Sequence, residues 1–84
     1  MNVEFSTAFK RDLRKVPKEV GQKFREKYAM FLEDPFNNSL RTHKLHGKME
    51  NHYAFSVTYG YRAIFMEKNG HFFFTEIGPH DDVY

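Results

Sequence analysis

The hydrophobic pattern changes its period once along the chain, and this change constrains the fold more than any other feature. Before residue 34, apolar residues recur every three or four positions, as they do along one side of a helix. After residue 51 they alternate with other residues, as they do in strands with one buried face. The Asn69-Gly70 pair lies within the alternating half and is the strongest short signal for a two-residue hairpin turn. The sequence therefore predicts helices first and an antiparallel sheet afterwards.

The first half predicts a short strand from Asn2 to Phe5, followed by two helices. Ser6 is a good N-cap for the first helix, because its hydroxyl can accept a bond from an amide in the first turn. Pro17 ends that helix and suits the first turn of the second, which ends before Asp34-Pro35 because the residue before a proline disfavours the helical conformation. Each helix has an apolar stripe that we expect to pack in a core: Phe9, Leu13 and Val16 in the first, and Val20, Phe24, Tyr28, Phe31 and Leu32 in the second.

The second half predicts three strands that form a meander. They lie between residues 52 and 59, from Tyr61 to Lys68 and from His71 to Ile77. On the first strand, we expect the side chains of Tyr53, Phe55, Val57 and Tyr59 to share one face, and the Phe72-Phe73-Phe74 run suggests burial on both faces of the last. The predicted fold class is α+β, with the N-terminal strand and the two-helix hairpin packed on an antiparallel sheet. Its element order is β-α-α-β-β-β, in a single domain of residues 1–84.

Composition excludes several classes of protein. The chain has no cysteine, so it has no disulfide framework or thiolate metal site, and a reducing compartment is expected. No apolar run approaches the ~20 residues that span a bilayer, and the N-terminus does not resemble a signal peptide. Five histidines are present, but none has the spacing of a helical metal site. We expect a soluble, cytoplasmic domain with no metal and no other cofactor.

An arginine lies within the apolar strand, where a charge has to be paired or used. Arg62 alternates with Ile64 and Met66, so it is expected on their face of the sheet. His80 and Tyr84 belong to a short tail that can fold back over the sheet. Our hypothesis is that Arg62, His80 and Tyr84 face one groove and handle a phosphate.

Each of these residues also has a simpler interpretation. Arg62 can pair with a nearby acid, for which Glu67, Glu76 and Asp81 are the candidates. His80 can cap a turn, and Tyr84 can close the edge of the sheet. From the residues alone, these alternatives stay open.

A cationic cluster without an internal acid lies between the helices and the meander. Its members are Arg41, His43, Lys44, His46 and Lys48. Such a cluster attracts a polyanion through the release of counterions, although an ordinary solvated loop has the same composition. The net charge of only +2 permits a nucleic-acid partner without establishing one.

Three segments of the chain, taken together, form a recognisable frame. They are Lys44-Leu45-His46-Gly47, Tyr61-Arg62-Ala63-Ile64-Phe65 and the final Ile77-Gly78-Pro79-His80-Asp81-Asp82-Val83-Tyr84. This frame resembles the RelE/ParE superfamily of bacterial toxins, and most closely the RelE and YafQ branch of mRNA interferases from type II toxin–antitoxin systems. The resemblance covers essentially the whole chain. It implies a RelE-like fold and a small endoribonuclease that enters the ribosomal decoding site and cuts the mRNA codon exposed there, so that translation is inhibited.

The resemblance also implies roles for individual residues. Arg62 matches the arginine of the Tyr-Arg strand motif, His80 the histidine of the Gly-x-His tail motif and Tyr84 the aromatic residue that ends it. His43 lies, relative to Gly47, where the YafQ branch carries a second catalytic histidine, although an exposed loop histidine is an equal alternative. In metal-independent RNA cleavage through a 2′,3′-cyclic phosphate, His43 would be the base, His80 the acid and Arg62 the cation that stabilises the phosphorane.

RNA contacts and partners follow from the same resemblance. Arg41, Lys44, His46 and Lys48 would hold the phosphate backbone, and Tyr84 would donate a hydrogen bond or stack on a base. The implied partners are the ribosome with its mRNA and a cognate antitoxin, which would wrap the toxin in a hetero-oligomer and block the groove.

The chain also departs from the family pattern. Many relatives carry an arginine in the first meander strand, where this chain has Phe55-Ser56-Val57, and Ser39 occupies the approximate position of the catalytic glutamate of the YoeB branch. Two further functions therefore stay open, a ParE-like inhibitor of DNA gyrase and a catalytically silent antitoxin-binding module.

Overall fold

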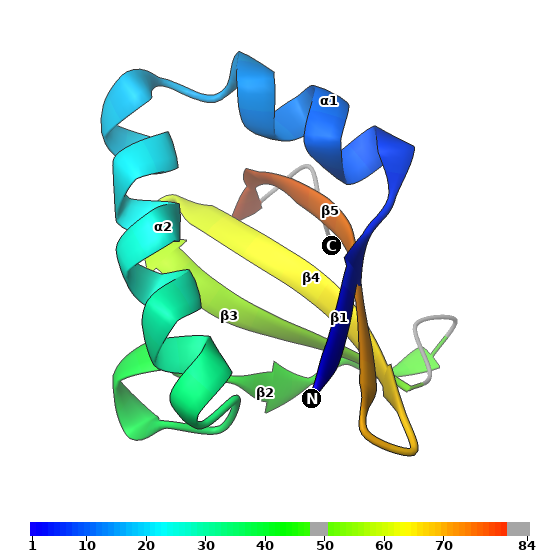
Figure 1. Cartoon of the computed structure of the whole chain (residues 1–84). Helices are drawn as coiled ribbons and strands as arrows, with labels where there is room; N and C mark the ends of the chain where they lie inside the picture. The colour runs from blue at the N-terminus through cyan, green and yellow to red at the C-terminus, as the bar shows by residue number, and fades with distance from the viewer. Residues whose placement is uncertain (48–50, 81–84) are drawn as a thin grey trace.

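The computed structural model describes residues 1–47 and 51–80. Its fold is α+β, as predicted: one strand, two helices and then the strands that complete a mixed five-stranded sheet (Figure 1). The elements are β1 (Asn2–Phe5), α1 (Thr7–Lys15), α2 (Lys18–Glu33), the short 3₁₀ helix η1 (Asn38–Leu40), β2 (His43–Lys44), β3 (His52–Thr58), β4 (Tyr61–Lys68) and β5 (His71–Pro79).

Ser6 begins α1 and also connects it to the sheet. Its Oγ accepts a hydrogen bond from the Phe9 amide at 2.9 Å, which confirms the predicted N-cap. The same hydroxyl donates to the carbonyl oxygen of Thr75 at 3.1 Å. Pro17 lies one position earlier than predicted, at the N-cap of α2 rather than in its first turn.

The sheet has the strand order β1-β5-β4-β3-β2. β3, β4 and β5 form the predicted antiparallel meander, and Asn69 and Gly70 adopt the positive φ angles of 53° and 81° that a type I′ turn requires. The two edge strands add pairings that the sequence did not indicate. β1 pairs in parallel with β5, from Asn2 opposite His71 to Phe5 opposite Phe74, and the two-residue β2 pairs with β3.

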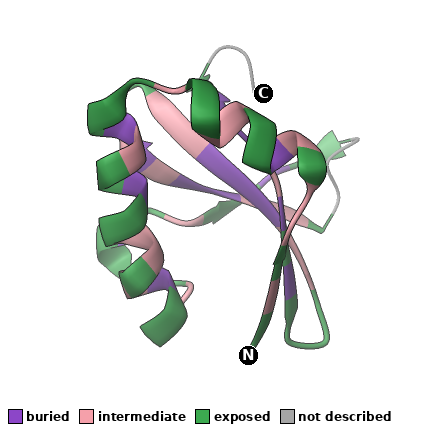
Figure 2. Ribbon diagram, turned by 45° about the horizontal axis from the view of Figure 1, so that its top comes forward, coloured by how far each residue is buried: buried purple, intermediate pink, exposed green. Residues whose placement is uncertain are grey.

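Both helices cover the same face of the sheet, and the core between them consists largely of phenyl rings. In Figure 2 the buried residues of α2 lie on its inner side and its exposed residues on the outer side. Phe74 is fully buried and contacts rings from β1, both helices, β3 and β4. Burial in this aromatic layer raises the pKa of the Tyr28 hydroxyl. None of the helices within the described ranges is long and apolar enough to cross a membrane.

The alternation along β4 divides its residues between the two faces as predicted. Ala63 and Phe65 belong to the core beneath the helices. Ile64 instead packs with Leu45 and Ala54 in a small separate cluster on the opposite face. Arg62 therefore projects from the face that the helices leave uncovered.

Three aromatic or aliphatic residues are more exposed than the sequence pattern predicted. Tyr59, expected on the same face of β3 as Phe55 and Val57, is 99% exposed, whereas those two are buried. The pairing of β3 with β4 shifts its register between Ser56 and Thr58, so the alternation breaks and Tyr59 falls in the reversal that joins the two strands. Such a bulge has no clear signature in a sequence that continues to alternate.

The other two exceptions have a different cause. Phe73 lies between two core residues of β5 and so points to the uncovered face, where it is 37% exposed. Leu32 ends the apolar stripe of α2, but it is 45% exposed because neighbouring Phe31 takes the inward position. The prediction of burial was wrong for both.

We expect the inward and outward positions at the end of α2 to differ strongly in their effect on stability. Phe31→Ala removes a fully buried ring that packs on Phe65, Phe72 and Phe74 at centroid distances of 5.1, 5.3 and 5.0 Å. It should lower the free energy of unfolding by about 3–5 kcal/mol. Urea titration followed by circular dichroism measures the free energy of unfolding. Leu32→Ala is the matched control, and it should lower this free energy by less than about 1 kcal/mol. Equal losses for the two variants would contradict the described packing.

Candidate functional site

Arg62 is held at the start of β4 by backbone oxygens rather than by an acid. Its Nη1 donates hydrogen bonds to the carbonyl oxygens of Thr58, Tyr59 and Tyr61 at 3.1, 3.1 and 3.2 Å. These carbonyls belong to the reversal between β3 and β4. Within the described residues, ion pairs join Arg11 to Asp12 and Lys23 to Glu26, so the predicted alternative of a pair with Glu67 or Glu76 is not observed. The other candidate partner, Asp81, lies outside the described residues.

The anchoring of one nitrogen leaves the rest of the guanidinium available. Nε and Nη2 of Arg62 have no hydrogen-bond partner among residues 1–47 and 51–80. A guanidinium can present two parallel N–H groups to a carboxylate or a phosphate. Arg62 is thus a positioned cation with donors to spare, at the edge of two surface hollows.

The first of these, which we name the His80 hollow, brings together two of the predicted site residues. It has a volume of about 470 Å³ and is lined by Tyr59, Gly60, Arg62, Pro79 and His80. The backbone N–H of His80 donates to the Gly60 carbonyl oxygen at 2.9 Å, so the contact between the two chain segments continues beyond the end of β5. Gly78 lies directly opposite Arg62, which places the Cα atoms of Arg62 and His80 roughly 8 Å apart by standard strand spacings. This distance allows both side chains to reach one phosphate group.

The second, the Lys27 hollow, lies on the other side of Arg62. It has a volume of about 310 Å³, and its lining consists of Lys27, Ser39, Arg41, Ser56, Thr58, Tyr59 and Arg62. The lining carries three cationic side chains and no acid. Lys27 is anchored by its Nζ, which donates to the Ser39 carbonyl oxygen at 3.2 Å. A hollow of this composition attracts an anion.

The remaining predicted residues of the cationic cluster do not form one patch. His43 lies opposite Ala54, and cross-strand partners project from the same face, so His43 shares the face of Arg62 at a Cα distance of roughly 12 Å. Its Nδ1 is 3.2 Å from the Arg41 carbonyl oxygen. Lys44, the next residue of β2, projects from the opposite face, and His46 is exposed beyond the strand. Lys48 and Tyr84 lie outside the described residues.

Two residues of these hollows were missed by the sequence analysis. The sequence pattern places Lys27 on the solvated side of a helix. It comes near Arg41 because α2 packs beside η1. Tyr59 lines both hollows, but the alternating pattern placed it on the same face as Phe55 and Val57. No local signal in the sequence identifies either residue.

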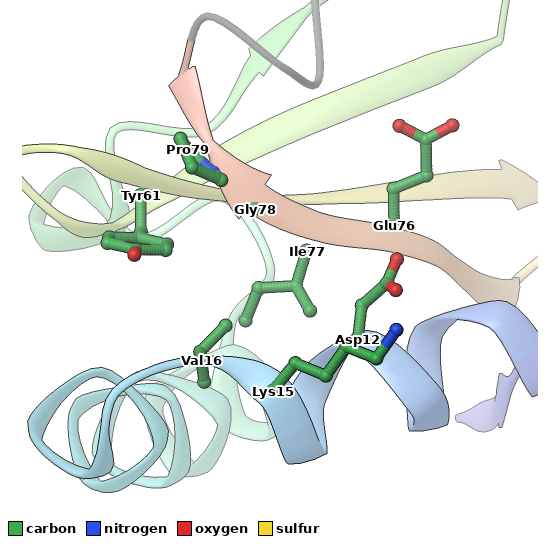
Figure 3. A pocket seen from close by; sticks show the side chains of 8 residues that line it. All are labelled: Asp12, Lys15, Val16, Tyr61, Glu76, Ile77, Gly78 and Pro79. Carbon is green, nitrogen blue, oxygen red and sulfur yellow. The ribbon is translucent and has the colours of Figure 1, made fainter.

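A third hollow, of about 300 Å³, lies between α1 and the end of β5 (Figure 3). Figure 3 shows Ile77 directed toward Val16 and Asp12 directed toward the strand. With Asp12, Lys15 and Glu76 in its lining, this hollow has mixed charge. The described residues contain no cluster of three or more side chains that could hold a metal ion.

The architecture of this chain is shared with solved YafQ, YoeB/ParE and RelE toxins, which confirms the resemblance indicated by the sequence motifs at the level of the fold. The crystal structure of YafQ from E. coli strain BL21(DE3) is similar to this chain with a TM-score of 0.83 and 15% identity, covering 99% of this chain and 97% of that one. The YoeB/ParE toxin from Agrobacterium tumefaciens gives a TM-score of 0.78 and 13% identity over 95% and 99% of the two chains.

A complex is also among the similar structures. The E. coli DinJ-YafQ toxin-antitoxin complex matches with a TM-score of 0.76 and 18% identity, covering 99% of this chain and 96% of the matched chain. No protein-family model matches the sequence, and the comparison with curated proteins finds no match. The similarity is therefore one of fold, retained at low identity.

We expect the three bonds from Arg62 to stabilise the fold as well as to position the cation. Arg62→Met keeps the length of the side chain but leaves three carbonyls without their donor, so the free energy of unfolding should fall by about 1–2 kcal/mol. Arg14→Met, at an exposed position of α1, is the control and should change it by less than about 0.5 kcal/mol. Urea titration of both variants measures the difference. If Arg62→Met matches the wild type, the bonds to the reversal contribute nothing to stability.

Proposed function

We propose that this protein is the toxin of a type II toxin–antitoxin system and acts as a ribosome-dependent mRNA endoribonuclease. In this proposal it cleaves mRNA in the ribosomal A site and so inhibits translation. The observation that carries the proposal is the His80 hollow, which is lined both by the anchored Arg62 and by His80. The fold shared with YafQ and with the YoeB/ParE toxin supports it.

The proposed reaction needs three groups around one phosphate. The ribose 2′-OH attacks the adjacent phosphorus, a base accepts its proton, and an acid protonates the departing 5′-oxygen. Arg62 would bind two phosphate oxygens and stabilise the charge that builds on the phosphorane. Its bonds to three carbonyls support this role, because a guanidinium already fixed in place needs no reorganisation when the charge develops.

His80 is the proposed acid and His43 the proposed base. An imidazole can donate a proton in its charged form and accept one in its neutral form, so it can serve in either role. His80 lines the hollow together with Arg62, whereas His43 shares only the face of the sheet, so it would reach the ribose from the β2 side. Tyr84 would complete the site by hydrogen bonding or stacking. The products would be a 2′,3′-cyclic phosphate and a free 5′-OH.

The cations around the site would hold the RNA backbone. Arg41 is supported most directly, since it lines the Lys27 hollow beside Arg62. Lys44 and His46 are exposed and would contact phosphates of the mRNA or of ribosomal RNA. We assign the same role to Lys48. Such contacts are sequence-independent and weaken as the salt concentration rises.

We further propose a cognate antitoxin as the physiological partner. DinJ-YafQ, which has the same fold in its toxin chain, is a toxin–antitoxin complex. An antitoxin that wraps this chain in a hetero-oligomer would block the groove, and the cytoplasm, where ribosomes and mRNA meet, would be the site of action. A ParE-like inhibition of DNA gyrase is the second candidate, because a YoeB/ParE toxin shares the fold, and a silent antitoxin-binding module is the third.

A translating bacterial extract tests the nuclease directly. Addition of the purified chain should create new mRNA 5′ ends at codons that occupy the ribosome, while naked mRNA stays largely intact. His80→Ala should slow cleavage by about 10²–10⁴-fold, the usual contribution of a general acid. His71→Ala, which alters an exposed histidine at the other end of β5, is the matched control and should cleave like the wild type.

The alternatives give different results in the same experiment. Loss of gyrase supercoiling activity with intact mRNA would establish the ParE-like function. An intact message together with unaffected gyrase would leave the antitoxin-binding module. If the chain cleaves but His80→Ala cleaves equally well, the nuclease is right and the assigned acid is wrong.

A further inference from the structure

Tyr59 is the most exposed large hydrophobic residue in the described part of the protein, and it lies in the reversal between β3 and β4. Its relative exposure is 99%, and its ring contacts no other aromatic ring within the described residues. A tyrosine buried on one side would contribute to stability, but this one contributes almost no buried area. A ring in this position is available to a ligand.

The backbone that carries this ring is fixed on both sides. The carbonyl oxygens of Thr58 and Tyr59 accept hydrogen bonds from Nη1 of Arg62. The carbonyl oxygen of the following residue, Gly60, accepts one from the N–H of His80. The ring is thus exposed on a reversal that both site residues hold in place, so binding a ligand there would cost little ordering of the backbone.

The Lys27 hollow beside Tyr59 has the charge of a phosphate site. Its two cations other than Arg62 are Lys27 and Arg41. Lys27 uses one donor on the Ser39 carbonyl and retains two of its three N–H groups. The side chain of Arg41 makes no hydrogen bond or ion pair within the described residues.

We propose that Tyr59 and the Lys27 hollow form a second nucleotide subsite, which binds single-stranded RNA next to the reacting phosphate. An unpaired base stacks on the Tyr59 ring, and the neighbouring phosphate is bound by Lys27 and Arg41. Arg62 lines both hollows and therefore connects this subsite to the reacting phosphate. The inference rests on the proposed function, since it names further contacts of the same substrate.

The combination of ring and charge favours single-stranded nucleic acid over an acidic peptide. Binding sites for single strands pair a cationic groove that follows the backbone with aromatic rings on which bases stack, independently of sequence. An acidic peptide would use the cations but would leave the ring exposed. In a duplex the bases are already stacked on one another, so the ring would have no open face to contact.

The test measures binding of a short fluorescent RNA whose 2′-hydroxyls are methylated, so that cleavage through the 2′-OH is blocked. Fluorescence anisotropy gives the dissociation constant for the wild type, for Tyr59→Ala and for Tyr59→Phe, which keeps a stacking ring. We expect Tyr59→Ala to weaken binding by about tenfold, within the range measured for loss of one stacked base. Tyr59→Phe should stay within about twofold, and a strand with an abasic site at the stacked position should remove the difference between the two variants.

The phosphate contacts have a separate signature in the dependence on salt. Arg41 has a positive φ of 55°, a conformation that glycine adopts without strain, so Arg41→Gly should fold normally. For this variant, the slope of log affinity against log salt concentration should decrease in magnitude by about 0.7, the value expected when one phosphate contact with a single strand is lost. Lys27→Gln should have the same effect. Tyr59→Ala should leave this slope unchanged.

The outcomes separate the inference from the proposed function. Unchanged binding by Tyr59→Ala, an equal loss on the abasic strand, or tighter binding of a polyglutamate peptide than of RNA would overturn the inference, whatever the extract assay shows. Failure of the wild type to bind the oligonucleotide would overturn it as well. Stacking that depends on Tyr59, combined with intact mRNA in the translating extract, would support the subsite and refute the nuclease.

Discussion

The packing of both helices on one face of the sheet is the constraint from which the rest of the molecule follows. A chain of 84 residues can build one core, and here that core consists largely of phenyl rings from β1, α1, α2 and the meander. The opposite face therefore has no helical cover. Among residues 1–47 and 51–80, Leu45, Ala54 and Ile64 form a small buried cluster on it. The polar and cationic residues of the two hollows are found at the end of this open face, where the strands reverse.

The fold was predictable wherever a local pattern specified it. Ser6 as a cap, the Asn69-Gly70 turn and the alternation that places Arg62 with Ile64 are all set by residues close together in sequence. The edge strands were not predictable in this way. β2 has two residues, and β1 pairs with a strand at the other end of the chain, so their partners are chosen by tertiary packing rather than by local preference.

The candidate site, too, was predictable only in the parts that a local sequence pattern specifies. Proximity of Arg62 and His80 follows from the register of two neighbouring strands, and the motifs were enough to expect it. The anchoring of Arg62 by three carbonyls was not foreseen, because sequence reasoning searches for charged partners and cannot see where a reversal directs its carbonyls. Tyr59 was misplaced for a related reason: one bulge in β3 cancels an alternation that the sequence alone would continue.

The double attachment of Ser6 has a consequence for synthesis of the chain. Its hydroxyl bonds the carbonyl of Thr75, 69 positions later, and its amide bonds the carbonyl of Phe74. The first strand therefore has to wait for β5 to be made before it can pair in the sheet. Because β5 also leads directly to His80, the two sides of the His80 hollow come together only after β5 has paired with β4. A growing polypeptide that has not yet formed β5 carries Arg62 without His80, so the lining of this hollow stays incomplete until the sheet closes.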